Sequence, residues 1–503
     1  MKGLSHTAME TLLSPEEIAT ITSAATHNDL LPDSLQTTVQ LIITDAERSI
    51  SRLDDEIVRI QATLDDLRSQ RTGHIARIQR YQTVIAPHRR LPVEMLEEIF
   101  AMCNLEPVAI PVQLEKAPWI LGRVCSKWRR VVLSAPMLWS HIRMNSGDQS
   151  VSGHARILEV LLSRSGQVSA SLRIAAGYPE HNKAGIKELD KLLASSASRL
   201  RRLCFEGPLS CVNSFLSLPL GSIGSLQTLE LIGPDFSDAQ KTLSVVRSAR
   251  NLREVTLEQV TNLSTVSILS IPFHQLTLLS LIAFNRPLPA ALGFDLLCQC
   301  TSLIECRLEI AAYTVPGHPH FSDWRAVVTL ENLKTFQFYT TGSLENVQWL
   351  EYLSFPNLTK FYHFHYPCDS TWPSAWTAGI CRSGHLESLD LNIPISSVNL
   401  EEILMATPLL CMLNIPQGMM ISETLLAGMS NGARIPRLSS LECPTDTERS
   451  LLAHLDMLES RRYGQSNVAN ISTAVFHVPE HGSGAAVDRV NQLINDGWNI
   501  TLR

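Results

Sequence analysis

A six-residue pattern, Leu-x-x-φ-x-φ with φ apolar, recurs ten times between residues 200 and 443 and constrains the fold more than any other feature. Successive copies begin 24 to 30 residues apart, and His363 is the single non-apolar residue among the thirty patterned positions. The copies are LRRLCF (200–205), LQTLEL (226–231), LREVTL (252–257), LTLLSL (276–281), LIECRL (303–308), LKTFQF (333–338), LTKFYH (358–363), LESLDL (386–391), LCMLNI (410–415) and LSSLEC (438–443). Such a period predicts that similar units stack on one another and bury a continuous core between them.

Each copy has the period of a β-strand. Successive side chains of a strand point to opposite sides, so positions 4 and 6 lie on one face and positions 3 and 5 on the other. Helical patterns run between copies, as in SLENVQWLEYLSF (343–355) and NLEEILMATP (399–408), with Ser343 and either Asn399 or Ser397 as expected N-caps. Strand, turn and helix at this period predict an α/β fold, a leucine-rich-repeat-like solenoid with a parallel concave sheet.

We expect this solenoid to be irregular on its convex side. Many repeats of this class carry Asn or Cys at position 9, but this chain has other residues there. They are Pro208, Pro234, Val260, Phe284 and Ala311. No asparagine ladder can form, so the convex helices should vary. The solenoid is placed at residues 150–460, with QVSASLRI as the capping strand before its first clear repeat. Its C-terminal cap, which includes STAVFHV and GWNITLR, is placed at 461–503.

Positions 3 and 5 of the copies should face the concave side, where solenoids of this kind bind other molecules. These side chains mix both signs of charge with neutral and aromatic groups, so they predict a protein-binding face without naming its ligand. The candidate target-binding residues are Arg202, Glu230, Glu254, Glu305, Arg307, Lys360, Tyr362 and Asp390. Arg199, Arg201 and Arg202 also form a basic cluster at the first copy. Because arginines suit phosphate, the alternatives there are a phosphopeptide site or a solvated strand edge.

A heptad pattern precedes the repeats. Apolar residues spaced alternately three and four apart predict a coiled-coil helix over residues 36–88, ended by Pro87. Its seam consists of Ile43, Ala46, Ile50, Leu53, Ile57, Ile60, Leu64, Leu67, Arg71, His74, Ile78, Tyr81 and Ile85. Residues 1–35 are polar with weak periodicity, and we expect a mostly disordered lead with at most a short helix at 15–25.

Arg71 and His74, with Gly73 between them, interrupt this seam. The interruption has three interpretations: a device that sets the register, a kink, or the bend of a helical hairpin. The seam as a whole has two. Either it pairs with a second copy of the chain, giving a homodimer through residues 43–85, or the helix lies against its own chain.

Residues 89–143 are expected to form three short helices. RRLPVEMLEEIFAMC (89–103) starts the first, and NLEPVAIPVQLEKAP (104–118) contains three prolines and is expected to be a loop. The later part contains Trp128 and Trp139. About fifty residues are too few to bury such large side chains well in isolation, so the surplus of apolar groups predicts a binding partner.

This stretch resembles the F-box. The family pattern is a Leu-Pro start, an acidic and apolar helix ending in Ile-Phe, a Val-Cys-x-x-Trp core and a late Leu-Trp. Its counterparts here are Leu91-Pro92, Ile99-Phe100, Val124-Cys125 with Trp128, and Leu138-Trp139. The match covers roughly a tenth of the chain. The coil before it and the repeats after it are similar to the large fungal F-box families, although the loop 104–118 is longer than in compact F-boxes.

The resemblance implies a substrate-receptor subunit of a Skp–cullin–F-box ubiquitin ligase. Such a subunit docks on the Skp adaptor and the cullin ligase core, recruits an unknown target protein, and is not itself an enzyme. By position the adaptor-facing residues are Leu91, Pro92, Leu96, Ile99, Phe100, Val124, Trp128 and Trp139, although some of these must hold the helices together. The alternative is a leucine-rich-repeat interaction scaffold with a non-degradative role for its F-box.

Composition argues against several other classes of function. The 503-residue chain has a formal net charge of −7 and no run of 18 or more apolar residues, so neither nucleic acid nor a membrane is expected as a partner. No secretory pattern is visible, and the eleven scattered cysteines are expected to be reduced thiols in the cytoplasm or nucleus. The sequence contains no nucleotide-binding glycine motif and no nucleophile elbow.

Two clusters contain residue types that bind metals: His363, His365 and Cys368, and Cys298, Cys300 and Cys306. His363 and Cys306 fall at core positions of the repeats, and no fourth ligand is evident in the first cluster. We therefore expect neither a metal nor another cofactor.

We predict that residues 36–88 self-associate. A peptide of these residues should sediment as an oligomer, and Ile57→Asp with Leu64→Asp should make it monomeric, because each charge would be buried in the seam. Analytical ultracentrifugation measures both. A wild-type peptide that stays monomeric at high micromolar concentration contradicts pairing and favours a helix that lies against its own chain.

Overall fold

The computed structural model describes residues 13–147, 151–177, 183–233, 244–260, 270–283, 287–311, 327–344, 347–367, 370–416, 419, 421–464, 468–478 and 484–503. Contacts within the chain divide it into two units, Met1–Pro92 and Val93–Arg503. The boundary lies inside the stretch that resembles the F-box, so Leu91 and Pro92 belong to the first unit.

The first unit consists of helices. Helix α1 (Pro15–His27) begins with a capping box, in which the Ser14 amide donates to the Glu17 carboxylate at 2.7 Å and the Glu17 amide donates to the Ser14 hydroxyl at 3.4 Å. Helix α2 (Asp33–Ile85) runs for 53 residues and a short 3-10 helix, η2 (Pro87–Arg90), follows it. Because α2 continues without a break through residues 71–74, the interpretation of that stretch as the bend of a hairpin is wrong.

The apolar seam of α2 is exposed to solvent. Its large apolar side chains are between 44% and 65% exposed, with Leu64 and Ile85 at the two ends of this range. A helix with such a stripe is stable in water when a second surface covers the stripe. Pairing of the coil with a second copy stays a prediction.

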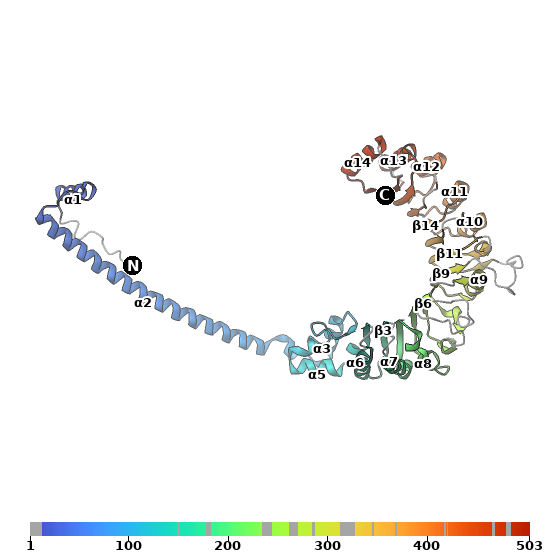
Figure 1. Ribbon diagram of the computed structural model, residues 1–503, viewed down its shortest axis with the longest axis horizontal. Coiled ribbons are helices and arrows are strands. Elements are labelled where there is room, and N and C mark those ends of the chain that lie inside the picture. The colour runs from blue at the N-terminus through green and yellow to red at the C-terminus, as the bar shows by residue number, and fades with distance from the viewer. Residues whose placement is uncertain are drawn as a thin grey trace. The chain divides into compact units, whose positions relative to one another are not determined.

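The second unit contains one long parallel sheet. Each strand pairs with the next strand of the sheet along the chain, as expected of a solenoid. In order across the sheet they are β1 (Val108–Ile110), β2 (His141–Ser146), β3 (Ala170–Ala176), β4 (Leu200–Glu206), β5 (Thr228–Ile232), β6 (Glu254–Val260), β7 (Leu278–Ala283), β9 (Glu305–Ala311), β11 (Thr335–Thr341), β13 (Lys360–Tyr366), β14 (Ser388–Asn392), β15 (Met412–Asn414), β16 (Ser440–Pro444), β17 (Thr473–His477) and β18 (Ile500–Leu502). Within this unit the strands line the inner side of an arc and the helices lie outside (Figure 1).

The thirty patterned positions form the core of this solenoid. Every one of them, including His363, is at most 1% exposed. In-register pairing stacks like positions on neighbouring strands, as in Leu203↔Leu229 and Leu389↔Leu413. The predicted α/β solenoid with a leucine-rich-repeat-like parallel sheet is therefore confirmed.

The convex side is irregular, as the missing asparagine ladder predicts. Its α-helices are α6 (Val151–Arg164), α7 (Lys183–Ser196), α8 (Asn213–Leu216), α9 (Ala290–Gln299), α10 (Ser374–Cys381), α11 (Ser397–Ala406), α12 (Glu423–Ser430), α13 (Glu448–Tyr463) and α14 (Ala485–Asn495). Short 3-10 helices replace them in other repeats. One of these, η11 (Gln348–Tyr352), lies within the segment 343–355, where we expected an α-helix; residues 345 and 346 are outside the described ranges. The N-cap of α11 is Ser396, whose hydroxyl accepts a hydrogen bond from the Asn399 amide at 3.2 Å.

Three further short strands in the described part of the chain fall outside this order. Strand β8 (Leu288–Pro289) pairs with β9, and β10 (Val328–Thr329) pairs with β12 (Leu353–Ser354). Across the described ranges, no helix is both long and apolar enough to cross a membrane. The ten cysteines in these ranges are all free thiols.

The sheet begins earlier than the repeat pattern indicates. The segment 104–118, expected to be a loop, contains β1, and QVSASLRI forms the third strand rather than the first. Alternation explains strand β1, because Val108 and Ile110 are buried on either side of Ala109. Pro107 and Pro111 flank the strand, where a missing amide donor costs no ladder bond.

One buried arginine holds the C-terminal repeats together. Arg461 on α13 is 1% exposed and donates hydrogen bonds to backbone carbonyls of the neighbouring segments. The clearest are those to Met429 at 2.8 Å, to Ala469 and Pro436 at 3.0 Å, and to Leu438 at 3.2 Å. Burial lowers the pKa of Arg461 to about 10, so the guanidinium remains charged at neutral pH.

We predict that Arg461→Met destabilises the C-terminal repeats by about 3 kcal/mol or more, because it leaves several buried carbonyls without a hydrogen-bond donor. Hydrogen exchange should show α12 and α13 opening more often, and the urea midpoint should fall. Arg449→Met is the matched control on the same helix, since the Arg449 side chain is 87% exposed. Equal effects of the two variants would contradict the assigned role.

Candidate functional site

Two surfaces of the second unit are candidates for binding: a helical segment at its start and the concave face of the sheet. The helical segment contains α3 (Val93–Cys103), α4 (Leu121–Val124), α5 (Ser126–Ser134) and the 3-10 helix η3 (Pro136–Trp139). Cys125 separates α4 from α5 and caps α5, since its sulfur accepts a hydrogen bond from the Trp128 amide at 3.5 Å.

The helical segment has a small core of its own. The rings of Phe100 and Trp128 meet edge to face with centroids 4.9 Å apart. Trp139 is fully buried, and its indole N–H donates to the Val132 carbonyl at 2.9 Å. A tryptophan buried in this way needs such a partner for its N–H. Both tryptophans therefore pack within or against the interior of the helical segment.

The residues expected to face an adaptor divide into two groups. Leu96, Phe100 and Trp139 are fully buried and Trp128 is partly buried, so these side chains form or border the interior. Ile99 and Val124 are exposed. In the first unit, Leu91 is partly buried and Pro92 is exposed. Contact of any of them with an adaptor stays a prediction, and the exposed ones are available for it without unfolding.

Exposed apolar side chains are concentrated on this segment. Residues 93–139 carry ten of the exposed large apolar side chains, as many as the described part of residues 140–503. Three of them, Met95, Ile99 and Met102, follow one another at helical spacing along α3. The others are Val93, Leu105, Leu114, Ile120, Val124, Leu133 and Met137. We call these ten side chains the apolar surface.

The helical segment and the solenoid are continuous. The Arg164 guanidinium at the end of α6 lies 4.7 Å from the ring centroid of Trp139 and 5.5 Å from that of Trp119, and the two rings are 5.0 Å apart. Strand β1, between α3 and α4, pairs with β2 as the edge of the sheet. Deletion of residues 89–143 would therefore remove the sheet edge along with the helices.

The second candidate site is a hollow of about 760 Å³ on the concave face, at strands β2 to β6. Five exposed arginines and a single carboxylate, that of Glu254, contribute to its lining. The arginines are Arg143, Arg173, Arg201, Arg202 and Arg253. We call this site the arginine hollow.

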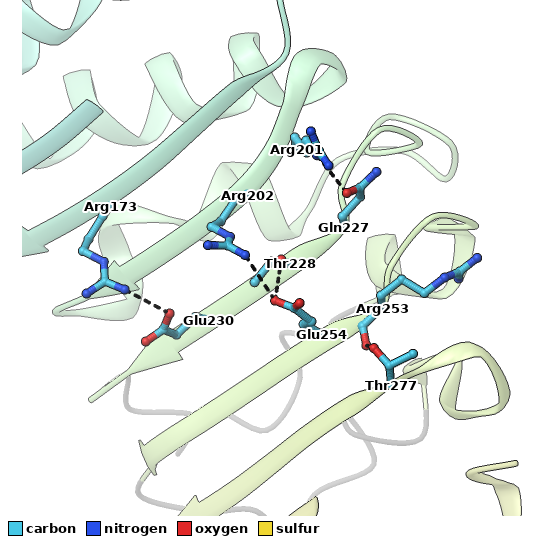
Figure 2. A network of polar contacts seen from close by, with 9 residues as sticks. All are labelled: Arg173, Arg201, Arg202, Gln227, Thr228, Glu230, Arg253, Glu254 and Thr277. Carbon is cyan, nitrogen blue, oxygen red and sulfur yellow. Dashed lines mark hydrogen bonds and ion pairs between the residues drawn. The ribbon is translucent and has the colours of Figure 1, made fainter. Parts of the chain in front are cut away.

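Loose ion pairs organise the arginine hollow (Figure 2). The Arg202 guanidinium lies 3.5 Å from the Glu254 carboxylate, which also accepts a hydrogen bond from the Thr228 hydroxyl at 2.8 Å. The Arg173 guanidinium lies 3.8 Å from the Glu230 carboxylate. Both ion pairs are longer than a good charge-assisted hydrogen bond and are open to solvent, so each is worth at most about 1 kcal/mol.

The arginine hollow offers groups that suit the binding of anions. Its thiol, Cys204, is buried; burial first, and then the Glu230 carboxylate, raises the pKa of this thiol to about 12. The thiol is therefore neutral at physiological pH and a weak nucleophile. The guanidinium groups around it are strong hydrogen-bond donors that suit carboxylates and phosphates.

The eight candidate target-binding residues lie on the same face of the sheet. The paired registers place them in two adjacent cross-strand rows, opposite the buried leucines. One row contains Arg202, Glu254, Glu305 and Lys360, and the other contains Glu230, Arg307, Tyr362 and Asp390. Their role in binding stays a prediction.

The structure changes the membership of the predicted basic cluster. Arg199 does not face the hollow: it donates to the Gly166 carbonyl and, at 2.8 Å, to the Leu162 carbonyl, at the end of α6. Arg143 and Arg173 were missed and take its place, on β2 and β3. The alternation in HIRMNS (141–146) is the signal for β2, although the F-box-like stretch 89–143 includes the first three of these residues.

The histidines considered as metal ligands belong to the core. The Thr340 hydroxyl lies 3.0 Å from Nε2 of His363 and 3.0 Å from Nδ1 of His365, and all three side chains are buried. Burial, with a smaller effect from His365, lowers the pKa of His363 to about 3. Cys368 lies outside the described residues, and within those described no group of three potential ligands converges on a metal position.

No protein-family model matches this chain, and no curated protein matches it. A solved structure of a leucine-rich repeat protein from Leptospira interrogans is similar, with 12% sequence identity and a TM-score of 0.32 over 81% of this chain and 98% of the other. A TM-score this low carries no argument. The strand ladder and the buried positions of this chain define its fold by themselves.

We predict that His363 makes the stability of the solenoid depend on pH. A neutral, buried His363 contributes stability that is complete above its ordinary pKa of 6.5 and is lost as the pH falls toward 3. Between pH 6.5 and 5 the loss is about 2 kcal/mol. Urea unfolding at pH 7.5 and 5 should show this loss in the wild type and less of it in His363→Phe. The exposed His385→Phe is the control, and an unchanged pH dependence in His363→Phe would contradict the prediction.

Proposed function

We propose that this protein is a substrate-receptor subunit of a Skp–cullin–F-box ubiquitin ligase. In this proposal the helical segment docks on the small Skp adaptor, and the concave sheet recruits a target protein. The observation that supports it is the apolar surface on a segment that also carries the F-box-like motif. Soluble proteins seldom expose apolar side chains so densely except where a partner covers them.

The apolar surface is not needed to hold the helical segment together. Leu96, Phe100 and Trp139 already fill its interior, while Met95 and Ile99 on the same helix point to solvent. Helix α3 thus has two apolar faces, one for its own core and one free to enter a groove or pack on another helix. Helix-in-groove binding uses anchors at this spacing.

The receptor forms no covalent bond in this scheme. It holds the target near a ubiquitin-charged enzyme carried by the rest of the ligase, which raises the local concentration of target lysines. A coil that pairs two copies would present two concave sheets and two adaptor surfaces at once. Two-point attachment of this kind raises the apparent affinity for a target without any new contact.

We predict that Ile99→Glu with Val124→Glu lowers adaptor affinity at least tenfold, because both charges would be desolvated in the interface. The same variant should melt like the wild type, since both side chains are exposed. Leu91→Ala with Pro92→Ala should also abolish co-purification of the adaptor. Co-purification with recombinant Skp adaptor and a thermal melt measure these effects.

The matched control is Val160→Glu, which alters a side chain that is equally exposed but lies on α6 of the solenoid. It should bind the adaptor normally. If wild-type protein does not bind the adaptor, or if the Ile99/Val124 variant binds as tightly as wild type, the ligase assignment fails. If the adaptor binds but no recruited protein is ubiquitinated, the scaffold alternative holds.

A further inference from the structure

The arginine hollow differs in charge from the sheet that follows it. We propose that it binds a peptide segment of the target with clustered anionic side chains, followed about six residues further on by cationic ones. This inference rests on the proposed function, because it names the class of segment that the concave sheet would recruit.

The guanidinium groups of Arg173 and Arg202 are available to a ligand. The side chains of Arg173 and Arg202 are 64% and 56% exposed, and their carboxylate partners are too distant for a two-pronged hydrogen bond. Such loose pairs keep the arginines extended over the sheet and are easily exchanged for a better-placed anion. A carboxylate or phosphate of a peptide can accept two parallel hydrogen bonds from one guanidinium.

The hollow has room for several side chains. Its volume of about 760 Å³ is within the range of pockets that enclose whole small ligands. It extends over five neighbouring strands. An extended peptide that crosses them meets arginines on β2, β3 and β4 at successive spacings of about 4.8 Å, and Arg253 directly before β6. A cluster of two to four anionic side chains fits this arrangement.

The sign of the charge changes along the concave face. Beyond the arginines, the sheet carries the carboxylate of Glu258 near the end of β6 and those of Glu305 and Glu309 on β9. The nearest cations are Arg307, to which Glu305 pairs at 3.2 Å, and Lys360, two strands beyond Glu305. Glu305 lies in the same row as Arg202, four strands away. Four strand spacings amount to about 19 Å, the length of about six extended residues.

This change of sign distinguishes a peptide from a long polyanion. A nucleic acid that follows the concave face would place phosphates over the three carboxylates, within the screening length of about 8 Å at physiological salt. The net charge of −7 adds to this repulsion. A peptide with anionic residues at one end and cationic residues at the other matches both halves of the face.

Fluorescence anisotropy of full-length protein with dye-labelled twelve-residue peptides tests the proposal. The mixed peptide has four glutamates, the spacer Gly-Ser-Gly-Ser and four lysines. In a second version of the same length, two phosphoserines and two glycines replace the glutamates. An all-glutamate peptide, a neutral glutamine peptide and a DNA oligonucleotide complete the set. We expect the mixed peptides to bind at least tenfold more tightly than the other three, and comparison of the two versions identifies the source of negative charge.

Two sets of substitutions locate the binding. Arg173→Glu with Arg202→Glu should weaken both mixed peptides at least tenfold, and Glu305→Lys should weaken them through their lysines. Arg449→Glu, in an exposed pair with Glu423 on the convex side, is the control and should change nothing. If the double glutamate variant melts early, Arg143→Gln with Arg202→Gln replaces it and should weaken binding at least threefold.

The proposal is overturned if the neutral peptide binds as tightly as the mixed peptides, or if the all-glutamate peptide or the DNA binds more tightly than they do. It is also overturned if the arginine substitutions leave the binding of the mixed peptides unchanged. Adaptor co-purification measured on the same variants separates this inference from the proposed function. Loss of peptide binding with intact adaptor binding removes the inference alone. Peptide binding without any adaptor binding leaves the hollow as a peptide site and removes the ligase assignment.

Discussion

The structure of the second unit depends on the stacking of its buried side chains across parallel strands. No single repeat can cover its own apolar face, because a strand of three to seven residues with one short helix has too little surface on either side. In-register pairing places Leu203 beside Leu229 and Leu231 beside Leu257, so each repeat completes the core of the one before. The buried face of one strand thus becomes the support for the next.

The same ladder organises the concave face without any additional interaction. Because side chains alternate along a strand, burying positions 4 and 6 forces positions 3 and 5 to the other side in continuous rows. Residues that are 24 or more positions apart in the chain become neighbours about 4.8 Å apart. The arginines of β3 and β4 and the carboxylates of β5 and β6 meet for this reason, and so a charged surface arises from residues that form no motif in the sequence.

The helical segment depends on this sheet as well. Strand β1 anchors the connection between α3 and α4 to β2, and Arg164 packs against Trp119 and Trp139 from the solenoid side. The apolar surface of the segment is therefore held on a rigid support rather than on a flexible linker. In the proposed receptor this rigidity would fix the direction in which a bound target is presented.

The sequence by itself determined the solenoid, its ten patterned strands and which of their positions are buried. Burial follows from a local six-residue pattern, and this pattern occurs in every one of the ten copies. It also determined the long helix α2, because a local heptad pattern predicts that helix.

Tertiary structure decided what depends on neighbours far along the chain. Strand β1 is stable only when it pairs with β2. Its alternation of buried and partly buried residues is only three residues long and is flanked by prolines, so the sequence alone indicated a loop. Arg199 points to the end of α6 and donates hydrogen bonds to carbonyls there. Arg143 and Arg173 lie beside Arg202 because the registers of β2, β3 and β4 set the positions of these three side chains. Phe100 and Trp139 became interior residues for the same reason: the pattern of a helix shows which side chains share a face, but only packing decides which of two apolar faces the protein covers with its own chain.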